Sequence, residues 1–449
     1  MAKNDTEGMP RHENAVRDEP VTTGDNISLT DMSERIVLSP IPSTKQSASP
    51  PFRKRNFVER IWHILGVEGN VQRAISLAVL ILTPLSWAIH FGLPTNATLV
   101  FVFTFLALIP QAQILGYYTE QLSLSSGEKI AALLNASLGN AVELIVAIIA
   151  LVKCELEVVQ ASLIGSVISN LLLVNGLAIL VGGAHNGEQI FSSSDAQLQS
   201  ALLAVAFSSV LFPTIFYFIE TEKITDDVTQ RQTHLLVLSR GTAVVLIVIY
   251  GTYLWYNMVT TRKRQDEEME SSESKSCSDN AEVPLVSPWL ATAILVIDTA
   301  LIAVTAEFLV SSINGLVAES PLSKQFVALI LLPIAGNAAE HASAVMMAWR
   351  NKMTMALDIA IGSSIQISIF LLPLIVVLAW ILGKPLTLYF DLFQTIVLIV
   401  TVFIVHYIVQ DGKTVWMEGV ILCSLYVILC VAFQVYPGSE SAASINSCL

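Results

Sequence analysis

Long apolar stretches follow one another along most of this 449-residue chain. The hydrocarbon core of a bilayer requires about 20 apolar residues for each helical crossing, and eleven stretches are that long or nearly so. One soluble core cannot bury so many apolar helices, and a mean hydropathy of +0.64 is typical of a membrane protein. The predicted spans are residues 74–92, 97–116, 128–152, 156–184, 198–220, 234–258, 289–313, 324–349, 355–382, 389–410 and 414–436.

Polar sequence lies at both ends of the chain and at one internal position. Residues 1–72 are rich in Ser, Pro, Glu and Asp and contain no early apolar run, so we predict a disordered cytosolic tail with a basic segment next to the membrane, and no cleavable signal peptide. Residues 259–287 form the only long polar interruption between spans, and residues 438–449 follow the last span.

The distribution of lysine and arginine predicts the orientation. With a cytosolic N-terminus, thirteen of these residues lie on the cytosolic side and six on the other, as the positive-inside rule expects. The thirteen are Arg53, Lys54, Arg55, Arg60, Arg73, Lys129, Arg262, Lys263, Arg264, Lys275, Arg350, Lys352 and Lys413. The six are Lys153, Lys223, Arg231, Arg240, Lys324 and Lys384. Eleven spans then place the C-terminus in the lumen or outside the cell.

Two short motifs occur twice with the same offset. Residues 139–143 (GNAVE) recur as residues 336–340 (GNAAE), and residues 165–168 (GSVI) recur as residues 362–365 (GSSI). One offset of 197 residues aligns both motifs and the segment between them, which indicates an internal repeat.

Each repeat contains five predicted spans, in residues 97–258 and 288–437. Because five is odd, the second unit must insert upside down relative to the first. Inverted repeats are a transporter architecture whose substrate site lies where the repeats meet, near the middle of the bilayer. We therefore predict an all-α polytopic membrane protein with 11 transmembrane helices and two inverted five-helix repeats.

Glu143 and Glu340, the acids of the repeated motif, fall near the middle of the third and eighth spans. A charge at this depth costs about 2.5 to 3.5 kcal/mol even on the lenient insertion scale, so such acids are rarely without a partner or a task. The repeat symmetry predicts that they face each other as transport residues. A structural hydrogen-bonded pair is the alternative.

The other motif residues supply neutral oxygens. In each motif the glycine shares a helix face with the glutamate four residues later, and the asparagine lies beside that glutamate. The glycine also permits local unwinding, which would expose backbone carbonyl oxygens as further ligands. Residues of the second motif helix in each half line the same cavity. The predicted lining is Gly139, Asn140, Ser166, Asn170, Gly336, Asn337, Ser363 and Gln366.

Two carboxylates with amide, hydroxyl and carbonyl oxygens favour a hard divalent cation. Ca2+ fits best because it tolerates six to eight oxygens in irregular geometry, Mn2+ is a second candidate, and Mg2+ fits less well. Buried and repelling each other, Glu143 and Glu340 should hold protons when no cation is bound, which predicts antiport. His341 points about 100 degrees away from Glu340 on a helix, which favours packing or proton relay over direct ligation.

Other functions find no support. Residues 412–414 (GKT) resemble the end of a phosphate loop, but Tyr407 stands where the loop needs glycine, so no nucleotide site is predicted. No basic surface indicates nucleic acid, no resident cofactor is expected, and we predict that the chain is not an enzyme. The oligomeric state is not predicted. The acidic run that contains Glu267, Glu268 and Glu270 is either a regulatory cation-binding segment or a solvated linker.

The paired motifs GNAVELI and GNAAEH closely resemble the signature of the CAX cation/proton exchangers, within the Ca2+/cation antiporter superfamily. The resemblance spans roughly residues 73–436 and is strongest to the fungal vacuolar calcium/proton exchangers. It implies ten core helices plus one peripheral N-terminal helix at residues 73–96, and import of cytosolic Ca2+ into an acidic vacuole driven by the proton gradient.

For the site, the resemblance implies that Glu143 and Glu340 bind Ca2+ and protons alternately. It makes a place in the proton path plausible for His341, and it favours a Ca2+-collecting or Ca2+-sensing helix in the acidic run at Glu267, Glu268 and Glu270. The vacuolar membrane is then the expected location. Exchange of Mn2+ for protons, a Na+-coupled exchanger and a cation channel with the two glutamates as its filter remain alternatives.

Overall fold

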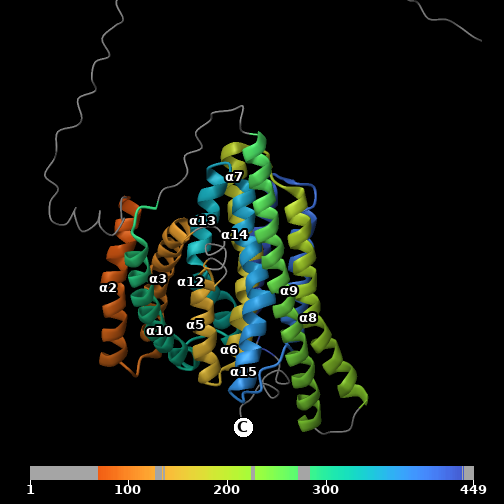
Figure 1. Cartoon of the computed structure of the whole chain (residues 1–449). Coiled ribbons are helices and arrows are strands. Elements are labelled where there is room, and N and C mark those ends of the chain that lie inside the picture. Colours follow the sequence, from red (N-terminus) through yellow and green to blue (C-terminus); the bar gives the residue numbers. More distant parts are fainter. Residues whose placement is uncertain are drawn as a thin grey trace, which may run out of the picture. The chain divides into compact units, whose positions relative to one another are not determined.

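The computed structural model describes residues 69–126, 134, 137–223, 228–271, 284–436 and 438, with the side chains of residues 221–223, 228–229 and 261–271 left out. Helices make up nearly all of this part of the chain (Figure 1). The α-helices are α2 (Asn70–Gly92), α3 (Ala97–Ser126), α5 (Ala141–Val152), α6 (Leu156–Ile168), α7 (Asn175–Asn186), α8 (Ser193–Lys223), α9 (Val228–Ser271), α10 (Pro288–Glu319), α11 (Lys324–Phe326), α12 (Leu332–Gly336), α13 (Ala338–Trp349), α14 (Met353–Ile365), α15 (Leu372–Ile381), α16 (Leu392–Val409) and α17 (Trp416–Val435). Three π-helical segments are η1 (Ser169–Val174), η3 (Val327–Leu331) and η4 (Gln366–Leu371), and two short strands are β1 (Gln189–Ile190) and β2 (Lys413–Thr414).

Among the described residues, nine helices are long and apolar enough to cross a membrane. The pair formed by residues 324–336 and 338–349 raises this number to ten if the two bent halves count as one span. The third predicted span, 128–152, is represented by the shorter helix α5, because most of residues 127–136 lie outside the description. The all-α membrane fold is confirmed, and the count of eleven spans stays a prediction.

Several boundaries differ from the prediction. Helix α3 continues past residue 116 to Ser126, and α9 continues past residue 258 to Ser271. Polar residues extend these helices because, outside the hydrocarbon, a helix still satisfies its own backbone hydrogen bonds. The N-terminal tail to residue 68, the side chains of Glu267, Glu268 and Glu270, and nearly all of residues 438–449 lie outside the described residues.

The internal repeat is visible residue by residue. The offset of 197 residues that relates Glu143 to Glu340 also converts the bounds of α5 into those of α13, those of α6 into those of α14, and those of η1 into those of η4. The turns agree as well, since Cys154 and Asn351 both adopt a left-handed backbone with φ of 63° and 60°. The two halves therefore share one local fold.

The first helices of the two halves run antiparallel. Backbone N–H groups of Ala97 and Thr98, at the start of α3, donate to the Glu319 carboxylate at the end of α10, at 3.4 and 3.1 Å. Midway along the same pair, Gln111 donates to the Thr305 hydroxyl at 3.3 Å. Equivalent helices must point in opposite directions when one repeat is inverted, so this pairing agrees with the predicted inversion.

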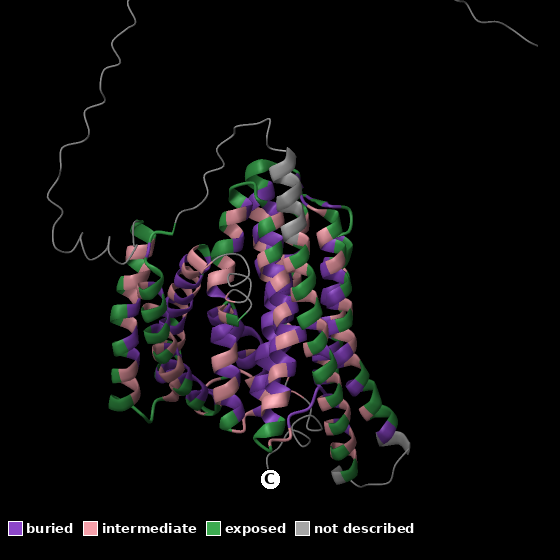
Figure 2. Cartoon of the chain, in the orientation of Figure 1, coloured by how far each residue is buried: buried purple, intermediate pink, exposed green. Residues whose placement is uncertain are grey.

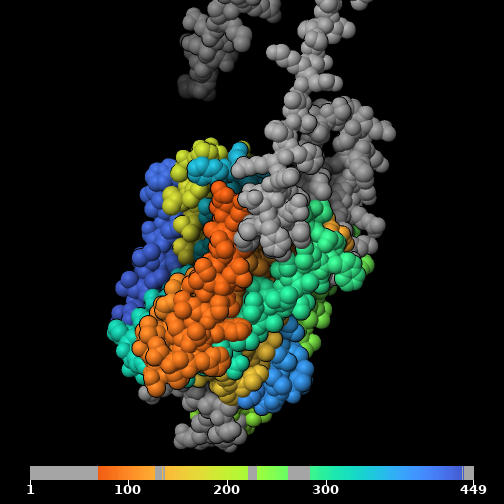
Figure 3. All heavy atoms as spheres, turned by 90° about the vertical axis from the view of Figure 1, so that its left-hand side faces the viewer, coloured from red at the N-terminus to blue at the C-terminus, as the bar shows by residue number. Residues whose placement is uncertain are grey.

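Helix α2 lies at the edge of the bundle against α3 and α10 (Figure 1). Only 17% of the most apolar 18-residue segment of α2 is buried, against 78% for that of residues 156–186. The space-filling view shows α2, α3 and α10 covering this face (Figure 3). Trp87 anchors α2 by donating to Thr305 at 3.2 Å. The helix has the peripheral place that the sequence predicted.

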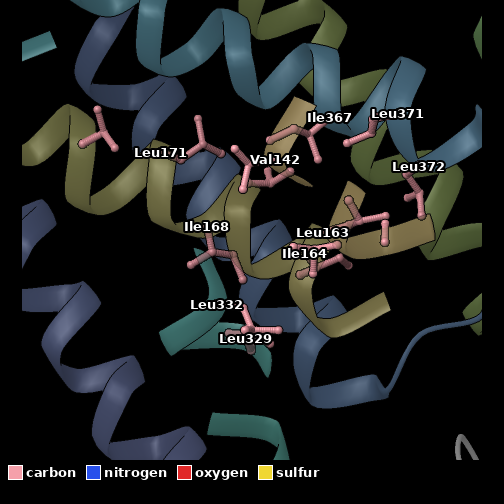
Figure 4. Packing of buried hydrophobic residues seen from close by; sticks show 14 of the residues in the cluster. Val142, Leu163, Ile164, Ile168, Leu171, Leu329, Leu332, Ile367, Leu371 and Leu372 are labelled. Atoms are coloured by element: carbon pink, nitrogen blue, oxygen red, sulfur yellow. The ribbon is translucent and has the colours of Figure 1, made fainter. Parts of the chain in front are cut away.

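The central helices α6 and α14 are mostly buried, whereas α2 and α9 expose much of their surface (Figure 2). Apolar residues of both repeats form one continuous cluster there, including Ile164 and Ile168 of α6 beside Leu329 and Leu332 of the second repeat (Figure 4). At the closest approach, a Cβ on Gly165 would lie 2.1 Å from the carbonyl oxygen of Leu329. The repeats thus meet in a tightly packed, largely apolar interface.

The two ends of the bundle carry different polar contacts. At one end, here called the Lys413 end, β1 pairs with β2 and Gln189 donates to the Ala348 carbonyl at 3.1 Å. At the other, the Lys324 end, Lys324 forms an ion pair with Glu155 at 2.8 Å. Residues that the positive-inside rule assigns to one side thus share an end of the bundle.

Candidate cation site

Both repeated GNA-E motifs lie at helix breaks. Asn140 precedes α5 with φ and ψ of −111° and 32°, and Asn337 separates α12 from α13 with −81° and 16°. The span of the second motif, residues 324–349, bends by 56° at this break. The predicted helix face is therefore interrupted, and both motifs show the local unwinding that their glycines permit.

Each break places its glutamate in the first turn of a half-helix, Glu143 in α5 and Glu340 in α13. The first backbone N–H groups of a helix lack intrahelical partners and carry the positive end of its dipole, which stabilises a nearby carboxylate. This geometry resembles the discontinuous helices that form ion sites in transporters.

The two glutamates share one enclosed region. Glu143 is buried and Glu340 is half-buried, and the Glu143 carboxylate lies against Gly336, four residues before Glu340. Both oxygens of Glu143 and Oε2 of Glu340 are enclosed without a hydrogen-bond partner. Enclosed carboxylate oxygens without partners are what a cation or a proton would satisfy.

Gly336 brings the second repeat directly against Glu143. A Cβ at Gly336 would lie 2.9 Å from Oε1 of Glu143, closer than real Cβ atoms approach other atoms. Its counterpart Gly139 is exposed. The first-half carboxylate therefore packs on second-half backbone, as the repeat interface predicts.

Neutral side chains form a hydrogen-bonded bridge between the repeats. Asn140 donates to Oε1 of Gln366 at 2.7 Å and accepts from the Ser363 hydroxyl at 2.7 Å. Asn170 in turn donates to Ser363 Oγ at 2.9 Å, and its Oδ1 is enclosed without a partner. Four of the predicted lining residues are thus brought together.

The second half makes the mirrored contact with different atoms. Asn337 donates to the backbone carbonyl of Ser166 at 3.2 Å, whereas Asn140 contacts the side chain of the equivalent serine, Ser363. Oδ1 of Asn337 is enclosed without a partner. The π-helical segments η1 and η4 begin directly after these serine helices, and π-bulges in α-helices are frequent at functional sites.

His341 lies beside Glu340 but turns away from the carboxylates. Its Nδ1 faces the carbonyl oxygen of Asn337 at 2.5 Å, one turn back along its own helix, and Nε2 is enclosed without a partner. The packing or relay role of His341 stays a prediction.

Within the described part of the chain, no three His, Cys, Asp or Glu side chains come together as a metal cage. A cation here would be held by two carboxylates and by amide, hydroxyl and carbonyl oxygens. A donor set of hard oxygens suits Ca2+ or Mn2+, and water would complete the coordination.

With this geometry in place, comparison with known proteins identifies the family. The sequence matches the sodium/calcium exchanger protein family over residues 96–259 and 290–435, more than half of the chain. The chain belongs to the sodium/calcium exchanger protein family.

Two relatives of this exchanger-family chain are named for cation transport. It is 42% identical to a vacuolar calcium ion transporter of Schizosaccharomyces pombe, over 76% of this chain and 80% of that protein. It is 36% identical to vacuolar cation/proton exchanger 3 of Oryza sativa subsp. japonica, over 80% of this chain and 85% of that protein. The resemblance to cation/proton exchangers that the motifs indicated is confirmed.

A solved structure has the same fold. The crystal structure of the Ca2+/H+ antiporter protein YfkE aligns with a TM-score of 0.67 and 32% identity, covering 81% of this chain and 100% of that one.

Two features of the exchanger-family chain were missed by the sequence reasoning. Asn175, in the apolar run LLLVNGLAIL, is fully buried with its amide unpartnered, and a lone polar residue within an apolar span was the signal that could have found it. The second is the polar network at the Lys324 end, where Lys324 contacts Glu155, and Gln325 contacts Glu157 and Gln394. Its members come from distant segments and leave no local pattern.

Proposed function

We propose that this chain is a secondary active antiporter that moves cytosolic Ca2+ into an acidic vacuole in exchange for protons. The observation that carries the proposal is the pair Glu143 and Glu340, of which both carboxylate oxygens of Glu143 and Oε2 of Glu340 are enclosed without hydrogen-bond partners. The names of the relatives, a vacuolar calcium ion transporter and a vacuolar cation/proton exchanger, support the choice of ion, counter-ion and membrane.

Exchange follows from the competition for these oxygens. In a low-dielectric enclosure two repelling carboxylates favour the protonated form, and a divalent cation between them favours the ionised form. The site therefore holds a cation or protons but not both at once. If only these two loaded forms convert between the two openings of the protein, transport in one direction is coupled to transport in the other.

Asn140, Asn337, Ser363 and Gln366 would complete the cation shell with neutral oxygens. The hydrogen bonds from Asn140 to Gln366 and from Ser363 to Asn140 link the two repeats directly at the site. A relative movement of the repeats would change these contacts, so occupancy of the site and the conformation of the protein would be coupled.

We further propose the topology that the lysine and arginine distribution predicts, with the N-terminal tail, the acidic run and the Lys413 end on the cytosolic side and the C-terminus in the lumen. Ca2+ then enters from the Lys413 end and leaves at the Lys324 end. The acidic residues Glu267, Glu268 and Glu270 remain candidates for a regulatory Ca2+ site.

The test is Ca2+ uptake into acid-loaded proteoliposomes, with lumenal pH recorded in the same vesicles. The wild-type chain should take up Ca2+ and release protons, and a protonophore should collapse the uptake. Glu143→Gln and Glu340→Gln keep the shape of the side chain and remove its titration, so each should abolish exchange while the protein still inserts.

Glu307→Gln is the matched control, because Glu307 has a 57% exposed side chain outside the site and should leave uptake close to wild type. Ca2+ uptake without a pH change would contradict the proposal and favour a channel. Uptake that follows a Na+ gradient would replace protons as the counter-ion. A clear preference for Mn2+ would replace Ca2+ as the transported cation.

A further inference from the structure

Asn175 is a buried amide that no step of the proposed exchange uses. It begins α7 directly after the π-helical segment η1, its side chain is 0% exposed, and neither Oδ1 nor Nδ2 has a hydrogen-bond partner. Burying an amide without partners is costly, so such groups in proteins usually serve a bound water, ion or functional residue.

The packing of α7 on α13 shows which way Asn175 faces. Near the ends of both helices, a Cβ on Gly182 would lie 3.0 Å from Cβ of Ala348, and Asn186 donates to the Ala348 carbonyl at 3.1 Å. Helix α13 also packs on η1, which precedes α7, so the two helices run side by side in the same direction.

Seven residues are two helical turns and return to the same face. Seven residues before Gly182 is Asn175, and seven residues before Ala348 is His341. Ala344, between His341 and Ala348 on that face, is 0% exposed. The register therefore sets Asn175 opposite His341 across the α7 to α13 interface.

The two side chains are chemically complementary. Nδ1 of His341 faces the Asn337 carbonyl and must donate to it, which leaves Nε2 of the neutral ring as an acceptor. Nε2 is enclosed without a partner, and the amide of Asn175 has free donor hydrogens. Asn175 thus has a donor without an acceptor, and His341 has an acceptor without a donor.

The internal repeat supplies an independent argument. At the offset of 197 residues, Asn175 corresponds to Leu372 and His341 to Leu144. In the apolar cluster, Leu372 is buried and Leu144 is partly buried. One half thus has two apolar residues at the positions where the other half has two polar ones.

We propose that Asn175 is a positioning residue for His341, donating a hydrogen bond through one bridging water to Nε2 of the imidazole. A polar enclosure with two or more hydrogen-bonding groups can hold a buried water. With both ring nitrogens engaged, the imidazole stays directed toward α7 and leaves the Glu340 carboxylate to the transported ion. The functional part of this inference rests on the proposed exchange, but the hydrogen bond itself does not.

The direct test is nitrogen NMR of the purified full-length chain with labelled histidine, in which the His341 signals are assigned by their loss in His341→Gln. In the wild type, Nε2 should have the shift of a hydrogen-bonded acceptor. Asn175→Leu, which introduces the residue of the equivalent position, should move Nε2 to the shift of a free ring nitrogen. Asn175→Ser, which keeps a donor, should restore the wild-type shift in large part. An Nε2 signal unchanged in Asn175→Leu would overturn the proposal.

Thermal unfolding in detergent gives a second readout, which tests whether residues 175 and 341 are in contact. The loss of Tm in Asn175→Leu and His341→Leu should not add, because the double variant recreates the leucine pair of the other half. Additive losses would overturn the proposal. If Asn175→Leu does not fold, Asn175→Ala takes its place in the NMR measurement with the same expected result.

Transport separates this inference from the proposed function. Ca2+ uptake should fall several-fold in Asn175→Leu and recover in Asn175→Ser. If the wild type exchanges no Ca2+ but the NMR shifts change as expected, the function fails and the positioning contact stands. If exchange is normal and the Nε2 signal does not respond to residue 175, the contact fails and the function stands.

Discussion

Gly336 of the second repeat lies so close to Glu143 of the first that a Cβ on the glycine would be 2.9 Å from Oε1 of the carboxylate. We expect Gly336→Ala to displace this carboxylate from the shared enclosure and to reduce Ca2+ uptake about tenfold or more, because small misplacements of a reacting group have large effects on function. Uptake into acid-loaded proteoliposomes measures the effect.

Gly241→Ala in α9 is the control for this prediction, since a Cβ there would meet no atom within 4 Å. It should leave uptake unchanged and, as a glycine inside a helix, gain stability of about 0.5 to 1 kcal/mol. Normal Ca2+ uptake by Gly336→Ala would show that the close contact between Gly336 and the Glu143 carboxylate is not needed for transport.

Gly165→Ala should affect folding rather than the ion site. A Cβ at Gly165 would lie 2.1 Å from the Leu329 carbonyl oxygen, and backbone atoms cannot move aside as a side chain can. Overpacking of this kind costs about 1 to 3 kcal/mol, so the unfolding temperature in detergent should fall.

The repeat provides its own control, Gly362→Ala, because no atom of the described chain lies within 4 Å of a Cβ at Gly362. Its unfolding temperature should stay near that of the wild type. If Gly165→Ala and Gly362→Ala lowered the unfolding temperature equally, the close packing of α6 on η3 would not be the cause of the loss in Gly165→Ala.

Asn140→Ala should weaken cation binding. It removes the acceptor of the Ser363 hydroxyl and the donor to Gln366, and unsatisfied buried polar groups cost about 1 to 3 kcal/mol each. We expect a Ca2+ affinity about tenfold lower in isothermal titration or in the concentration dependence of uptake. Ser162→Ala is the control, since that hydroxyl donates to the carbonyl of Val159 in its own helix. If Ser162→Ala lowered the Ca2+ affinity as much as Asn140→Ala, the effect of Asn140→Ala would not be specific to the site.

The ion pair at the Lys324 end should make stability depend on pH. Burial raises the pKa of the Glu155 carboxyl, but hydrogen bonds from Lys324 and Asn314 and the charge of Lys324 lower it more, so the net pKa is below its usual value. A carboxyl whose pKa is lowered by folding adds stability above its unfolded pKa, and this stability is lost as pH falls through the folded pKa.

The difference in unfolding temperature between the wild type and Lys324→Met should therefore be full at pH 7 and shrink below about pH 5. Lys153→Met should show a smaller difference, because the partner of Lys153 in its ion pair, Glu307, is more exposed. A difference for Lys324→Met that is constant between pH 7 and pH 4 would rule out the Glu155 carboxyl as its cause.

The sequence predicted the repeat, the two acids and most of the polar lining because these follow from local patterns. An acid inside an apolar span is visible in one dimension, and an offset shared by two motifs requires only alignment. The boundaries of α5, α6 and η1 and of their counterparts obey that offset in the structure, since similar sequences in similar surroundings fold alike.

The sequence indicated that the motif glycines permit local unwinding, but it did not decide whether the helices break there. A continuous helix and a broken one satisfy the same short pattern, and the choice depends on what lies beside the backbone. At Gly336 the neighbour is Glu143, nearly two hundred residues away in the chain, and this contact exists only after the two repeats have packed together.

The sequence by itself thus determined the membrane fold, the two halves and the identity of the acids, because hydrophobicity, charge and repetition are properties of the residues. Only the tertiary structure decided that the acids sit at the starts of two half-helices and that Asn140 reaches Ser363. The reason is that partners distant in the chain are chosen by packing, which depends on every neighbour at once and leaves no pattern in one segment alone.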